Sequence, residues 1–164
     1  MISLFRQNSE AAWEYREAWY DEAAGEFVVH YGAVGANGKL TAEKAQADEA
    51  EALLEGFAAQ CEADGYREIG QLQTVELVVA VPLKASEPSA SERRNAETVH
   101  TAVLTGLAWR GLGALSDPEI EEHADGAALV MRARTVHRRK AGEAVRGALR
   151  ATDVPASKVR IRVG

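Results

Sequence analysis

Cysteine, proline and aromatic residues are scarce in this chain of 164 residues, which has one cysteine, four prolines, three tryptophans, four tyrosines and three phenylalanines. The single Cys61 excludes an intrachain disulfide framework and is compatible with a reducing compartment. Residues 1–10 hold only short apolar pieces broken by polar side chains, so no secretory signal is expected. No stretch approaches the roughly 18 apolar residues that a membrane span requires. We therefore expect a cytoplasmic protein without membrane contact.

Charge is unevenly distributed along the chain. The net charge is −6, but residues 1–72 hold 14 acidic and 5 basic residues, a net of −9, whereas residues 73–164 hold 11 acidic and 14 basic residues, a net of +3. The overall acidity argues against general attraction to nucleic acids, and the asymmetry still permits a local basic surface. This break favours two small domains, residues 1–72 and 73–164. The high content of alanine, glycine, glutamate and arginine suggests a GC-rich bacterial genome.

Sequence patterns typical of catalysis are also missing. The chain has no nucleophile elbow, P-loop or dinucleotide-binding fingerprint. Its four histidines are scattered and lack the spacing of metal ligands. We therefore expect no catalytic residue, no metal and no cofactor. The three tryptophans, Trp13, Trp19 and Trp109, are predicted to be core or interface anchors, because a chain with few aromatic residues tends to bury them.

The first half predicts a small antiparallel sheet followed by a helix. β-Branched and aromatic residues favour strands at residues 13–20 and 26–31, joined as a hairpin by a loop over residues 21–25. A further short strand is possible at residues 39–41. Apolar residues then recur with helical spacing, which predicts a helix over residues 42–63 that buries Ala50, Leu53, Leu54, Phe57, Ala58 and Cys61. Gly65 is placed to end this helix in a left-handed conformation.

The stretch His30-Tyr31-Gly32-Ala33-Val34-Gly35 lies between these strands and the helix, which is followed by Gly65-Tyr66-Arg67-Glu68. This order resembles the WGR domain, a module best known from DNA-damage-responsive ADP-ribosyltransferases. The resemblance covers about residues 1–70, and Tyr31, Gly32 and Ala33 stand at the positions of the family's tryptophan, glycine and arginine. It implies an antiparallel sheet with one long helix. It also implies a sheet surface where Tyr31 could stack on nucleic acid beside the cations Arg16 and Lys39. The alternative is that Tyr31 packs within the half-buried sheet.

The second half predicts strand, helix, strand, strand, helix, strand. Strands are expected at residues 74–81, within 114–123, at 127–135 and at 159–163. A helix from Ser89 through about Leu107 is expected to bury Ala96, Val99, Val103 and Leu107. Gly111 and Gly113 follow it and prevent it from continuing. The last helix buries Ala141, Ala144, Val145, Ala148 and Leu149. This βαββαβ order is typical of a ferredoxin-like α+β module, with both helices on one face of the sheet.

Basic side chains alternate along two strands of that sheet. Arg132 and Arg134 are two residues apart on one strand, and Lys158, Arg160 and Arg162 alternate on the other, so each set projects to one face. That face is the one the helices leave open. Three interpretations remain: a solvated sheet with Glu76 between arginines, a surface covered by the acidic first half or by a second copy, or an RNA-binding face, which would lack stacking aromatics.

The sequence therefore predicts a two-domain α+β protein that acts as a non-catalytic interaction protein. Its expected partner is another protein or a second copy of itself. The alternative is a nucleic-acid-binding protein that contacts DNA ends or strands. The candidate binding residues are Tyr31, Gly32, Arg16, Lys39, Arg132, Arg134, Arg160 and Arg162.

Overall fold

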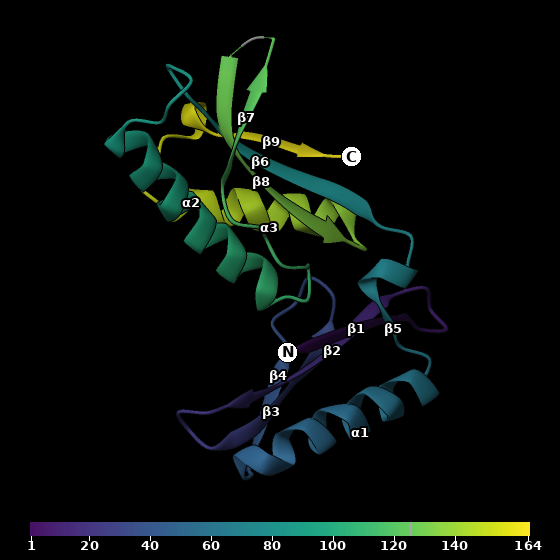
Figure 1. The fold of residues 1–164 in the computed structure, drawn as a ribbon. Coiled ribbons are helices and arrows are strands. Elements are labelled where there is room, and N and C mark those ends of the chain that lie inside the picture. The colour runs from purple at the N-terminus through teal and green to yellow at the C-terminus, as the bar shows by residue number, and fades with distance from the viewer. Residues whose placement is uncertain (125) are drawn as a thin grey trace.

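The computed structural model describes residues 1–124 and 126–164, and these residues form an α+β fold with two antiparallel sheets and three α-helices (Figure 1). Residues 1–72 and residues 73–164, here called the first and second halves, each contain one sheet. Asp125-Gly126 is a turn dipeptide in the sequence before the 127–135 strand, and Asp125 lies outside the described residues. None of the described helices is long and apolar enough to cross a membrane.

The sheet of the first half has five strands in the order β4-β3-β2-β1-β5. The predicted hairpin is present, because β2 and β3 pair antiparallel from Glu14 opposite Ala33 to Asp21 opposite Glu26. Gly25 adopts the left-handed conformation, with φ of 63°, in the turn between them. The strands are β1 (Ile2–Gln7), β2 (Trp13–Asp21), β3 (Glu26–Ala33), β4 (Lys39–Lys44) and β5 (Arg67–Glu68).

The helix predicted over residues 42–63 begins later than expected. β4 continues to Lys44, a short 3-10 helix η1 (Ala47–Glu49) follows, and α1 spans Ala50–Ala63. The prediction was wrong at its start because residues 39–44 gain backbone pairing with β3 and an ion pair between Lys44 Nζ and Glu26 at 3.1 Å. The predicted end is confirmed, since Gly65 follows the helix with φ of 88°.

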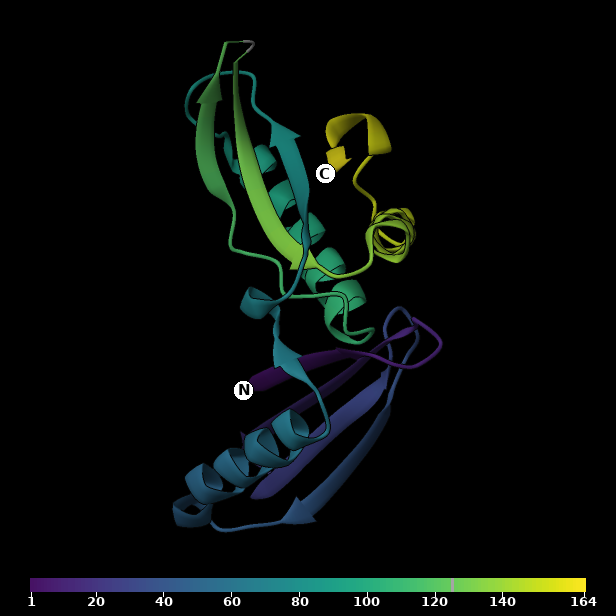
Figure 2. The ribbon, with the colours of Figure 1, turned by 90° about the vertical axis from the view of Figure 1, so that its right-hand side faces the viewer.

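The two faces of the first sheet have different neighbours. α1 covers one face, where Leu4, Cys61 and Tyr66 form a buried cluster with Phe57 packed against it. Of the six residues expected in the buried stripe, only Cys61 is fully buried and Leu53 is exposed, and the other four are partly buried: Ala50, Leu54, Phe57 and Ala58. The opposite face turns toward the second half, and both views show the sheet between α1 and that half (Figures 1 and 2).

The second half has the predicted element order, and its strands are arranged β7-β8-β6-β9. The short 3-10 helix η2 (Ile69–Gln71) leads into this half, and a second, η3, precedes its last strand. Ser89 caps α2 by accepting a hydrogen bond from the Glu92 N–H. Of the residues predicted to be buried in the two helices, Ala148 is only partly buried. The elements are β6 (Val75–Pro82), α2 (Ala90–Ala108), β7 (Glu119–His123), β8 (Gly126–Thr135), α3 (Arg138–Arg150), η3 (Ala156–Lys158) and β9 (Arg160–Val163).

One hydrophobic core joins the two halves. Phe5, Tyr15 and Val34 from the first half belong to the same buried cluster as Leu77, Val103, Met131 and the other core residues of the second half. Gly111 lies against the ring of Tyr15 so closely that any Cβ atom there would overlap the ring. The end of α2 and the segment after it therefore pack directly on the first sheet.

Candidate functional site

The segment that resembles the WGR motif lies at the junction of the two halves. Val34 is completely buried, and the N–H of Gly35 donates to the carbonyl oxygen of Arg110 at 2.7 Å. Lys140 Nζ donates to the Val34 carbonyl oxygen at 2.6 Å. Gly32 is also needed for close packing, since a Cβ there would lie 3.0 Å from Gly38 Cα. This loop is therefore a packing element of the junction.

Tyr31, Arg16 and Lys39 lie together on the α1 side of the first sheet. Tyr31 is opposite Arg16 in the β2–β3 register and opposite Lys39 in the β3–β4 register. Tyr31 is 39% exposed, so its ring is accessible to a partner. The structure thus brings together three of the four candidates that the sequence placed in the first half, and the fourth, Gly32, is the packing residue next to Tyr31.

Arg16 is engaged within the molecule. Its guanidinium donates to Asp64 Oδ2 at 2.5 Å and lies over the Tyr66 ring, 4.4 Å from the centroid. The hydrogen bond from Arg16, with a second from Gln60, lowers the pKa of Asp64 below its ordinary value. Arg6 lies over the same ring at 4.6 Å. Arg16 therefore fixes the segment after α1 and does not present a free cation.

A chain of polar side chains is buried beneath the junction. Glu17 accepts from Ser3 Oγ at 3.1 Å, and its other oxygen lies 3.1 Å from His30 Nδ1. His30 Nε2 lies 3.0 Å from the Tyr15 hydroxyl, and Gly38 packs so closely against that hydroxyl that a Cβ atom there would overlap it. Burial, together with the charge of Glu17, raises the pKa of Tyr15 to about 12.

With a neutral His30, the side chains of Glu17, His30 and Tyr15 each have a hydrogen-bond partner in this network. His30 Nδ1–H then donates to Glu17, and Tyr15 donates to Nε2. Tyr15 and His30 are both buried, so no substrate reaches them in this conformation. A carboxylate, an imidazole and a hydroxyl in line are also the elements of a catalytic triad, but here they hold β2 to β3 and to the loop after β3.

The basic face of the second sheet is partly neutralised by glutamates. Glu76 lies 3.5 Å from Arg132 Nε and 4.0 Å from Arg162, as the salt-bridged interpretation expects. Arg132 also forms a two-pronged ion pair with Glu121. Arg134 and Arg160 are exposed and form no ion pair within the described residues. The first half does not cover this face, which forms a shallow depression of about 360 Å³ over Val78, Ala80, Ala128 and Val130.

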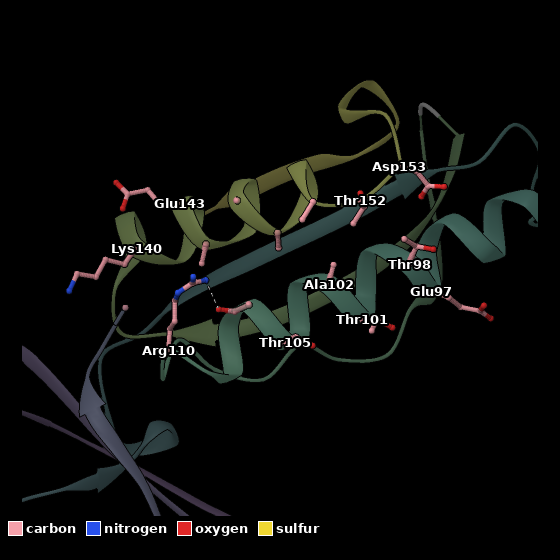
Figure 3. Close-up of a pocket in the computed structure, with 16 residues that line it drawn as sticks. Glu97, Thr98, Thr101, Ala102, Thr105, Arg110, Lys140, Glu143, Thr152 and Asp153 are labelled. Carbon is pink, nitrogen blue, oxygen red and sulfur yellow. Dashed lines mark hydrogen bonds between the residues drawn. The ribbon is translucent and has the colours of Figure 1, made fainter. Parts of the chain in front are cut away.

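A groove with a volume of about 1140 Å³ lies between α2 and α3 (Figure 3). Small side chains line its length on both helices: Thr98, Thr101, Ala102, Thr105 and Gly106 on α2, and Ala144, Gly147, Ala148 and Ala151 on or just after α3. Sequence reasoning missed this groove. The available signal was the recurrence of threonine and small residues at helical spacing on the outer faces of both helices.

The two ends of the groove differ in charge. Arg110 and Lys140 lie at the end next to the first half, together with Glu143, which is paired with Arg139 (Figure 3). Glu97 and Asp153 lie at the other end. The lining contains no histidine or cysteine that could activate its threonine hydroxyls. In the described residues, no group of three or more histidine, cysteine, aspartate or glutamate side chains could hold a metal ion.

No model of a known protein family matches this chain, and no curated protein matches its sequence.

Proposed function

We propose that this chain is a non-catalytic interaction protein that holds a helical segment of a partner protein in the groove between α2 and α3. The observation that supports this proposal is the groove itself, which is long, open and lined by small side chains. Packed helices lie about 8 to 10 Å apart, and small residues at the contact allow the closest approach. A partner helix could therefore sit along both α2 and α3.

The charges at the groove ends favour one direction for the partner helix. The carboxyl end of a helix carries a partial negative charge, and its amino end carries a partial positive charge. A helix whose carboxyl end lies at Arg110 and Lys140 places its amino end at Glu97 and Asp153. Such a helix runs parallel to α2, whose carboxyl end, at Ala108, lies two residues before Arg110.

The nucleic-acid alternative has weaker support. Duplex affinity depends on cations that are free to neutralise phosphates. Arg16, Arg132 and Arg162 are instead paired with Asp64, Glu121 and Glu76. Tyr31 remains accessible, but Lys39 is the only free cation that the register places beside it within residues 1–124 and 126–164.

The proposal is tested by photo-crosslinking in cells. A photoreactive residue replaces Thr101, which is exposed in the groove, and a second variant carries it at Glu122 on β7 as the control position. We expect a discrete protein adduct at Thr101 that is missing at Glu122. Equal adducts at both positions, or none at Thr101, would contradict the proposal.

A groove-filling variant gives the matched control. A Cβ atom at Gly147 meets no atom within 4 Å, so Gly147→Leu starts its side chain in open space and extends it into the groove. Gly56 on α1 has the same open surroundings, so Gly56→Leu makes the same chemical change elsewhere. We expect the Thr101 adduct to disappear in the first variant and to persist in the second.

A further inference from the structure

The outer strand of the first sheet, β4, has an unpaired edge. The strand order places β4 at one end of the sheet, and its six residues are all exposed. Figure 2 shows it at the margin of the lower sheet, with no element beyond it. An exposed strand edge presents unpaired N–H and C=O groups to any chain that can pair with them. β4 has no proline or bulge that would prevent this.

The backbone groups that point outward can be identified. The N–H of Ala45 donates to the Gly25 carbonyl oxygen at 3.2 Å, so Ala45 points toward β3. Backbone direction alternates along a strand. The N–H and C=O groups of Leu40 and Ala42 therefore point away from the sheet.

Exposed apolar side chains gather around this edge. Tyr31 and Leu53 flank it on the α1 side, with exposed fractions of 39% and 38%. Leu40, which is 47% exposed, lies on the opposite side of the sheet. Its pairing partner His30 stacks edge-on against Trp109, with the two ring centroids 5.1 Å apart. Trp109 was predicted to be buried or an interface anchor, and it is 49% exposed. Four of the six large exposed apolar residues in the described chain thus surround β4.

We propose that two copies of this chain associate through their β4 strands, which pair antiparallel about a two-fold axis at Thr41. This proposal is independent of the α2–α3 groove. In that register Leu40 pairs with the partner's Ala42, and Ala42 with the partner's Leu40, so the outward backbone groups bond each other. Both sheets then continue as one, with the α1 helices on the same side.

The side chains match in this register as well. Lys39 lies opposite the partner's Glu43, and Glu43 lies opposite the partner's Lys39, while Thr41 faces its own copy. Opposite charges and threonine pairs stabilise antiparallel strands when they lie directly across from each other. Lys39 and Glu43 form no ion pair within residues 1–124 and 126–164, so both are free for the partner.

The other strand edges do not allow such pairing. β5 has only two residues. Antiparallel self-pairing of β7 would bring carboxylates of Glu119, Glu121 and Glu122 together, and self-pairing of β9 would oppose Arg160 and Arg162. Within the described strands, β4 is the one edge whose charges are self-complementary. A two-fold contact also closes on itself and does not continue into a filament.

Charge exchange tests the register. Lys39→Glu places two glutamates opposite each other, and Glu43→Lys places two lysines opposite each other. Sedimentation is measured at protein concentrations from about 1 to about 200 µM. We expect the wild-type chain, of 17.7 kDa, to sediment as a dimer at the highest concentrations. Each single variant should weaken dimerisation about tenfold or more. The double variant should dimerise as the wild type does.

Mixing the two single variants provides the most specific result. In a mixed pair both cross-strand contacts are again between opposite charges, so equal amounts of the two variants should form a heterodimer. Glu122→Lys, on the exposed edge of β7, is the control for the change in net charge. A wild-type chain that stays monomeric throughout, singles that dimerise as tightly as the wild type, or a mixture that stays monomeric would each overturn the proposal.

A disulfide provides an independent readout. At the two-fold axis the Thr41 residues form a non-hydrogen-bonded pair, with Cα atoms about 4.5 Å apart, a distance that a disulfide spans. Thr41→Cys should therefore cross-link two copies under mild oxidation. Glu43→Cys should not, because it faces the partner's Lys39. The native Cys61 is buried and does not interfere.

Discussion

Lys140 and Val34 are 106 residues apart in the chain, and Lys140 Nζ donates to the Val34 carbonyl oxygen at 2.6 Å. This contact ties the amino-terminal turn of α3 to the loop that follows β3. The carbonyl group belongs to Val34, which is completely buried, so its oxygen has no access to solvent and accepts a hydrogen bond from Lys140 instead. The two halves are therefore held in one orientation by a polar contact as well as by the shared core.

Lys140→Met should lower the free energy of unfolding by about 1 to 3 kcal/mol, because the buried carbonyl loses a charged donor. Urea titration followed by tryptophan fluorescence measures the change. Lys84→Met removes a lysine from an exposed loop and should change stability by less than about 0.5 kcal/mol. Equal effects of the two substitutions would show that the contact does not stabilise the junction.

Gly111→Ala should destabilise the protein by about 2 to 4 kcal/mol. Gly111 has φ of 56°, and an added Cβ would overlap the buried ring of Tyr15. Gly147→Ala is the matched control, since its Cβ meets no atom within 4 Å and alanine favours a helix by roughly 0.5 to 1 kcal/mol. The midpoint of thermal unfolding should therefore fall in Gly111→Ala and rise in Gly147→Ala. A wild-type midpoint for Gly111→Ala would contradict the packing of Tyr15 on Gly111.

Tyr15→Phe should cost about 1 to 3 kcal/mol, because it leaves His30 Nε2 without its hydrogen-bond partner in a buried site. Tyr20 provides the comparison. Its hydroxyl donates to the Ala45 carbonyl oxygen at 3.2 Å at a partly exposed site, so Tyr20→Phe should cost clearly less. Chemical denaturation of both variants at neutral pH decides between these outcomes.

The Arg16–Asp64 ion pair should make stability depend on pH in the acid range. Hydrogen bonds from Arg16 and Gln60 hold the pKa of Asp64 below its ordinary value of 3.8. A carboxyl group with a lowered pKa in the folded state contributes its full stabilisation above about pH 4 and loses it as the pH falls through the folded-state value. The stability difference between the wild type and Asp64→Asn should therefore shrink below that pH.

This pH dependence is measured by urea unfolding from about pH 7 to about pH 3. Glu55→Gln, on the exposed side of α1, controls for general loss of a negative charge. A difference between the wild type and Asp64→Asn that stays constant over this range would show that the ion pair does not stabilise the fold.

Binding to nucleic acids should be weak and should show no steep salt dependence. Two of the four candidate arginines of the second sheet, Arg132 and Arg162, are paired with glutamates, and the first half is strongly acidic. Fluorescence anisotropy with blunt duplex, nicked duplex and single strands, at about 50 and 200 mM salt, measures this directly. Micromolar binding that collapses at the higher salt, and that is lost in Arg134→Ala with Arg160→Ala, would favour the nucleic-acid alternative.

Local patterns in the sequence predicted most elements of the second half. Ala96, Val99, Val103 and Leu107 were expected on the inner face of α2 and are all buried. Helical spacing alone determines which side chains share a face, so this needs no knowledge of the rest of the chain. The start of α1 could not be found in this way, because residues 39–44 form a strand only when β3 is beside them.

The candidate site was only partly accessible to sequence reasoning. The sequence placed Tyr31, Arg16 and Lys39 near one another, and the register brings them together. It could not assign Arg16 to Asp64 or Arg132 to Glu121, because these partners come from other elements. The groove between α2 and α3 was missed for the same reason, since its two walls are separate in sequence.

Local spacing in the amino-acid sequence therefore predicted the hairpin, the inner faces of α2 and α3, and the glycine after α1. The neutralised cations, the exposed tryptophan and the hollows of the surface became visible only in the folded chain. Periodicity describes neighbours within one element. Charge pairing, exposure and grooves depend on how elements far apart in the chain pack together.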